Sequence, residues 1–64
     1  MDEKIQNIIL NICHNGTHSA KIKDLLIATG LSKLELWKQL QQAQFKWRIS
    51  ENLNGIKLLV IDEL

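Results

Sequence analysis

Several features that define many small proteins are scarce or absent in this sequence. Its 64 residues include no proline, one cysteine and three glycines, and the formal net charge is only +1. The single cysteine, Cys13, cannot form an internal disulfide, which fits a reducing compartment. The absence of proline fits short, regular helices and strands.

Long hydrophobic runs are also missing. No uninterrupted run is longer than that of residues 58–61, which is far too short to cross a bilayer. The first residues, Met1, Asp2 and Glu3, lack the basic and apolar regions of a secretion signal. We therefore expect a cytoplasmic protein with no membrane partner.

The sequence contains little that could support catalysis, a cofactor or a metal ion. It has no glycine-rich phosphate loop, and no serine or cysteine has an obvious base partner. Cys13, His14 and His18 lie close together, but a closed zinc site generally needs four ligands and no second Cys or His pair exists. Asp62 and Glu63 are more simply a solvated tail. We expect no enzyme, no cofactor and no metal site, and Cys13 buried.

The chain is long enough for one small globular domain, spanning residues 1–64. Hydrophobic residues make up 45% of the sequence and charged residues 23%, which favours an ordered domain over a disordered segment. At this length the core is small and the free energy of unfolding amounts to only a few kcal/mol.

Apolar residues at helical spacing predict two helices in the first half of the chain. The first covers about residues 2–14, with Asp2 as its N-cap and the dipeptide Asn-Gly that follows as its end. After a short extended link, Ser19 is expected to cap a second helix over about residues 19–29. The apolar positions are Ile5, Ile8, Ile9 and Ile12 in the first helix and Ile22, Leu25 and Leu26 in the second.

A third helix is predicted over about residues 32–44. Ser32 and Glu35 stand three residues apart as a capping box, in which each side chain bonds the other residue's backbone N–H. Glu35 therefore has a structural role. The buried stripe of this helix is expected to comprise Leu36, Leu40 and Ala43.

Beyond the third helix the pattern predicts a β-hairpin over about residues 46–61. Asn54-Gly55 is a strong signal for a two-residue turn. With that turn, Ile49 faces Val60. The opposite face then carries Arg48 and Ser50 beside Leu59 and Ile61. An apolar pair on such a face needs cover, which predicts a homodimer through the C-terminal strand or the first helix, or another protein partner.

The order helix, link, helix, turn, helix, hairpin resembles a winged helix-turn-helix domain. Residues 22–32, followed by Leu36 and Leu40, look like the helix-turn-helix pattern of bacterial transcription regulators, with Gly30 in the turn. The resemblance covers about residues 5–61. It implies a mainly α fold with a small β-hairpin (α+β), namely three helices and a C-terminal wing. It also implies binding of double-stranded DNA in transcription regulation, with the third helix in the major groove.

Basic residues are gathered in the middle of the chain, where that motif lies. Residues 20–48 hold six basic residues against two acidic ones. With Leu36 and Leu40 inward, Leu34, Lys38 and Gln41 fall on the far side of the third helix, and Trp37 and Gln42 at its edges. Lysine and glutamine can bind base edges, a helix start favours phosphate, and basic hairpin residues can hold the DNA backbone. The candidate DNA-binding residues are Ser32, Lys33, Trp37, Lys38, Gln41, Gln42, Lys46, Arg48 and Lys57.

Leu34 and Trp37 leave other interpretations open. The tryptophan could contact a thymine methyl or a sugar, anchor a protein partner, or fold back against Trp47 or Phe45. The polar residues of the third helix could simply be a solvated face. The alternative function is a protein-interaction module whose contact surface is Leu34, Trp37, Leu59 and Ile61.

Overall fold

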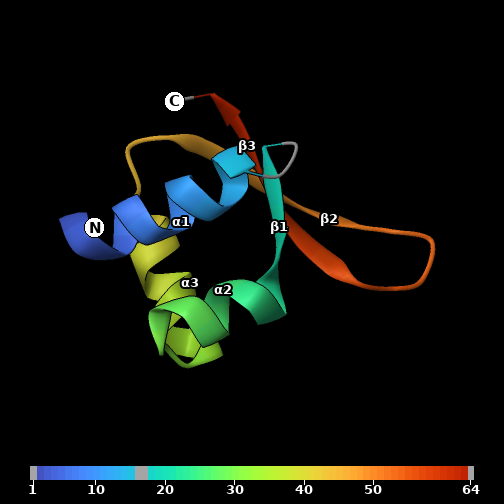
Figure 1. Ribbon diagram of the computed structural model, residues 1–64, viewed down its shortest axis with the longest axis horizontal. Coiled ribbons are helices and arrows are strands. Elements are labelled where there is room, and N and C mark those ends of the chain that lie inside the picture. Colours follow the sequence, from blue (N-terminus) through green and yellow to red (C-terminus); the bar gives the residue numbers. More distant parts are fainter. Residues whose placement is uncertain (1, 16–17, 64) are drawn as a thin grey trace.

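Three helices and a three-stranded antiparallel sheet make up the part of the chain that the computed structural model describes, residues 2–15 and 18–63 (Figure 1). The α+β class predicted from the sequence is confirmed, and the layout is compatible with a winged-helix arrangement. In chain order the elements are α1 (Glu3–Asn15), β1 (Ser19–Lys21), α2 (Ile22–Thr29), α3 (Lys33–Gln41), β2 (Lys46–Glu51) and β3 (Lys57–Glu63).

The first helix lies within one residue of its predicted bounds. The Asp2 carboxylate accepts hydrogen bonds from the N–H groups of Lys4 (2.8 Å) and Ile5 (3.2 Å), so it caps α1 as expected. Ile9 and Cys13 of α1 are buried. Of the predicted stop and link, Gly16 and Thr17 lie outside the described residues.

The predicted start of the second helix is wrong. Residues 19–21 form β1, and α2 begins only at Ile22, after Lys21 in an extended conformation (φ −65°, ψ 137°) that makes no side-chain cap. Ser19 pairs with Val60 and so belongs to the sheet instead of capping a helix. The reason is long-range, because β1 is held by hydrogen bonds to a strand that follows it by more than thirty residues.

The turn between α2 and α3 follows the predicted pattern. Gly30 adopts a left-handed conformation (φ 72°), and its N–H donates to the Leu26 carbonyl at 2.9 Å, which ends α2. The capping box is present: the Glu35 N–H donates to Ser32 Oγ (3.2 Å) and the Ser32 N–H donates to Glu35 Oε1 (3.3 Å).

The third helix is shorter than predicted, ending at Gln41 and not near residue 44. The N–H of Gln42 bonds the Gln39 carbonyl at 3.1 Å, and that of Ala43 bonds the Leu40 carbonyl at 3.1 Å, so the last turn tightens. Phe45 is buried after this tight turn, and the chain continues directly into β2.

The predicted hairpin turn is also wrong by one residue. Asn52 and Ile56 close the loop through a 3.0 Å hydrogen bond, which leaves three residues in the turn, and its only positive φ is that of Gly55 (77°). Ile49 consequently pairs with Leu59 and not with Val60. Because side chains alternate along a strand, this slip moves the apolar residues of β3 to the other face of the sheet.

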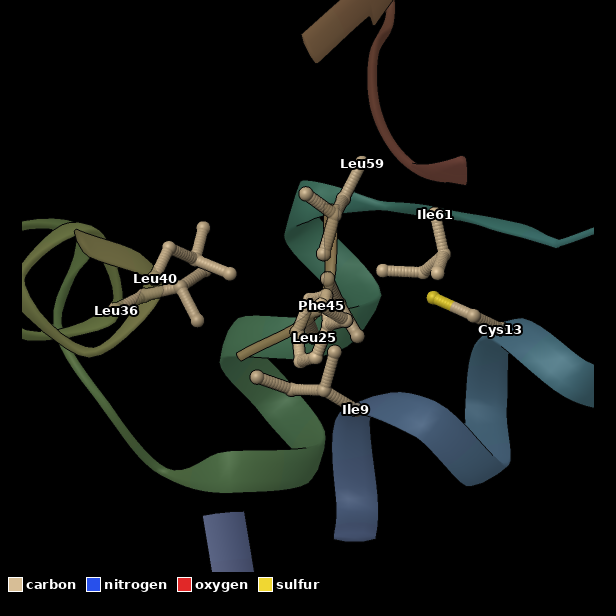
Figure 2. Packing of buried hydrophobic residues seen from close by; sticks show 8 residues of the cluster. All are labelled: Ile9, Cys13, Leu25, Leu36, Leu40, Phe45, Leu59 and Ile61. Atoms are coloured by element: carbon tan, nitrogen blue, oxygen red, sulfur yellow. The ribbon is translucent and has the colours of Figure 1, made fainter. Parts of the chain in front are cut away.

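The core therefore forms between the three helices and one face of the sheet, and β3 lies between β1 and β2. Leu59 is fully buried and Ile61 is 7% exposed, so both belong to this core and are not available to a partner. Figure 2 shows the Cys13 side chain pointing toward Ile61. The buried cluster comprises Ile9, Cys13, Leu25, Leu36, Leu40, Phe45, Leu59 and Ile61.

Candidate nucleic-acid interface

The outer surface of α3 combines two apolar and two polar side chains. Leu36 and Leu40 are buried, and a step of about 100° per residue places Leu34, Lys38 and Gln41 on the solvent side of the helix. Leu34 is 63% exposed, and Trp37 at the edge of this side is 49% exposed. These side chains form what we call the α3 outer face: Leu34, Trp37, Lys38 and Gln41.

An apolar groove lies between α3 and the hairpin. Its volume is about 190 Å³, and it brings Trp37 of α3, Ile49 of β2 and Lys57 of β3 together. Ile22, Leu36 and Leu40 complete its lining. Two candidate residues that are 20 positions apart in the sequence, Trp37 and Lys57, thus line one concave surface.

Trp47 fixes the hairpin against α3. Its indole N–H donates to the Leu40 carbonyl at 2.9 Å, and its ring meets Trp37 edge to face with the centroids 5.4 Å apart. The suggestion that Trp37 packs against Trp47 is therefore confirmed, although half of the Trp37 side chain stays exposed. The contact orients Trp37 at the groove without burying it.

Three exposed lysines belong to α3 and the hairpin, and one of them, Lys57, lines the groove. Lys33 and Lys38 lie on α3 and Lys57 begins β3, and all three are exposed. None of them forms an ion pair with any residue in the described ranges. Their charges are therefore available to an anionic ligand.

Other predicted residues already have partners within the fold. Arg48 Nε lies 3.0 Å from an Asp62 carboxylate oxygen, in an ion pair whose side chains are 59% and 43% exposed. Gln42 is the C-cap residue of α3, and Lys46 begins β2 and pairs with Glu63 in the strand register. At Ser32, the hydroxyl donates to Glu35 Oε1 at 2.9 Å as part of the capping box. A phosphate at Ser32 would thus meet the Glu35 carboxylate.

The hairpin end carries apolar residues that sequence reasoning did not select. The hairpin projects beyond the helices in Figure 1, and Leu53 at its tip is fully exposed. Ile56 and Ile49 are 37% and 39% exposed on the same hairpin. The sequence did not predict their exposure, because the expected register, wrong by one residue, placed Leu59 and Ile61 outward instead.

Metal-ligating groups do not converge within the described residues, where no group of three His, Cys, Asp or Glu side chains is arranged to hold an ion. The rings of His14 and His18 meet edge to face with centroids 6.4 Å apart. Cys13 is a free, buried thiol, and burial raises its pKa above the ordinary 9.0.

No family model, curated protein or solved structure matches the chain. Among the helices of the described residues, none is long and apolar enough to span a membrane.

Proposed function

We propose that this chain is a winged helix-turn-helix domain that binds double-stranded DNA in transcription regulation in the cytoplasm. The order α1-β1-α2-α3-β2-β3, with β3 central in the sheet, agrees with the resemblance of its helix-turn-helix pattern. In this proposal α3 enters the major groove and the hairpin lies along the flanking backbone.

The observation that carries the proposal is the exposure of Lys33 and Lys38 on α3 together with Lys57 of the hairpin, which lines the groove beside α3. They come from two elements, are exposed and have no ion-pair partner in the described residues. Contacts between such lysines and the phosphates beside a groove supply much of the affinity of DNA-binding domains. Gln41, on the α3 outer face, adds a side chain able to pair with adenine.

The test is a titration of the labelled protein with mixed-sequence duplex DNA at low and moderate salt, followed by backbone amide shifts. We expect the largest shifts in residues 32–42 and in the hairpin, and weaker binding at moderate salt. An absence of shifts at low salt would overturn the proposal. Shifts confined to α1 would do the same, because α1 lies outside the proposed surface.

A second candidate function, binding of a partner protein, is favoured by the exposure of Leu34 and Trp37. Large exposed aromatic residues often anchor protein interfaces. The contact surface for a partner protein is smaller than predicted, because Leu59 and Ile61 are buried. The reason for expecting a homodimer also no longer holds, because Leu59 and Ile61 are buried within the chain itself. Under this second function the duplex titration leaves α3 unshifted.

A further inference from the structure

We propose that α3 recognises the 5-methyl groups of pyrimidines in the major groove, through Leu34 and Trp37. The inference rests on the proposed function and adds the class of site that is preferred: duplexes rich in thymine, or carrying 5-methylcytosine. It is drawn from the kind of side chain that the α3 outer face presents.

Leu34 is placed where a recognition helix contacts base edges. It lies in the first turn of α3, and the N-terminal residues of a recognition helix are those that meet base edges. Its side chain is 63% exposed and belongs to none of the buried or partly buried clusters of the fold. The core therefore does not need Leu34, which leaves its apolar surface for a ligand.

Trp37 extends the same apolar surface toward the hairpin. It lies three residues after Leu34, which puts the two side chains about one turn apart on neighbouring sides of the helix. Its edge-to-face contact with Trp47 limits its rotamers, so little side-chain entropy remains to be lost when it binds. The two side chains thus form an exposed apolar strip in which Trp37 is oriented by Trp47.

The major groove offers few groups that fit such a strip. Base edges there are hydrogen-bond donors and acceptors, except for the methyl group of thymine, which 5-methylcytosine shares. Burying Leu34 against an unmethylated polar edge would desolvate that edge without replacing its hydrogen bonds. Lys38 and Gln41 beside the strip can bind phosphate and adenine, and adenine is the partner of thymine.

The test compares four 20-base-pair duplexes at one salt concentration: alternating A·T, the same duplex with uracil for thymine, alternating G·C, and the same duplex with 5-methylcytosine. Each pair differs only in methyl groups. We expect the methylated member to bind at least about fourfold more tightly, the change that burial of one methyl-sized group produces. Fluorescence anisotropy gives the dissociation constants.

Methyl groups also affect the shape of DNA, so a preference for methylated duplexes could arise without direct contact. Two variants distinguish direct contact from an effect of DNA shape. In Leu34→Ala the affinity ratio between thymine and uracil duplexes should fall toward one. Ile27→Ala, which removes an apolar side chain of similar exposure (72% against 63%) from α2, should keep the wild-type ratio. Circular dichroism verifies that both variants are folded.

The outcomes distinguish this inference from the proposed function. Equal binding of the members of each pair, or a ratio unchanged in Leu34→Ala, overturns methyl recognition while leaving DNA binding in place. Failure to bind any of the four duplexes at low salt overturns both.

Discussion

Cys13 shows how burial changes the chemistry of a single residue. Its side chain is 2% exposed and packs in the core of the domain next to residues from the sheet. Because the thiolate is poorly solvated there, burial raises the pKa of the Cys13 thiol. The native state therefore favours the protonated form more strongly than the unfolded chain does.

This preference predicts a pH dependence of stability. The folded chain holds the Cys13 proton to higher pH than the unfolded chain, so its contribution to the free energy of unfolding is fully present below the unfolded pKa. It is lost as the pH rises from about the ordinary value of 9.0 through the raised native pKa. Urea denaturation between pH 7 and 10.5 measures it.

The control for this prediction is Cys13→Ala, which has no group to titrate at that position. Above pH 9 the stability difference between wild type and variant should narrow as pH rises. A constant difference would contradict the prediction, since every other ionisable side chain is present in both proteins.

The register of the β2–β3 hairpin determines which side chains of its two strands face the core. A three-residue turn ending at Gly55 pairs Trp47 with Ile61 and Ile49 with Leu59, and this places the apolar positions of both strands on the core side. Val60, which the two-residue turn would have put inside, is only partly buried on the opposite face.

Two alanine substitutions in β3 test this register. Leu59→Ala removes a fully buried side chain and should lower the free energy of unfolding by about 2–5 kcal/mol. Val60→Ala should cost about 1 kcal/mol or less, because its side chain is only partly buried. Urea denaturation gives both values.

If Val60→Ala lowered the free energy of unfolding as much as Leu59→Ala or more, the register would be contradicted. If Leu59→Ala is unfolded in buffer, Leu59→Met provides the milder comparison, because it nearly conserves volume and should cost less than about 1.5 kcal/mol.

The whole molecule concentrates its positive charge without being basic overall. The formal net charge is +1, yet α3 carries two exposed lysines, Lys33 and Lys38, and Lys57 lines the groove between α3 and the hairpin. Any affinity for DNA must therefore come from local placement of charge and not from a general electrostatic attraction. Such binding is sensitive to salt in proportion to the number of phosphates contacted.

This arrangement predicts that the affinity for DNA depends only moderately on salt concentration, in proportion to the number of lysines that contact phosphate. If Lys33, Lys38 and Lys57 each neutralise one phosphate, the logarithm of the binding constant should fall with the logarithm of salt concentration with a slope of about −3. Lys57→Gln should reduce the slope by about one. Lys4→Gln, the same charge change on α1, should leave it as in the wild type.

Anisotropy titrations at four or more salt concentrations measure these slopes. An unchanged slope in Lys57→Gln, or an equal change in Lys4→Gln, would show that binding is not localised at the groove.

Features that depend on neighbours along the chain can be predicted from the sequence alone. The Asp2 cap, the left-handed Gly30 and the capping box of Ser32 with Glu35 all lie where it predicted. Each involves residues within about four positions of one another, so the residue types alone specify the hydrogen bonds.

Features that depend on residues distant in the sequence are set by the tertiary fold. Residues 19–21 are a strand because β3 lies alongside them, and Leu59 is buried because the turn holds three residues and not two. Trp37 faces the groove because Trp47, which is bonded to the Leu40 carbonyl, holds it there. Such contacts join residues far apart in sequence, and periodicity within one segment carries no information about them.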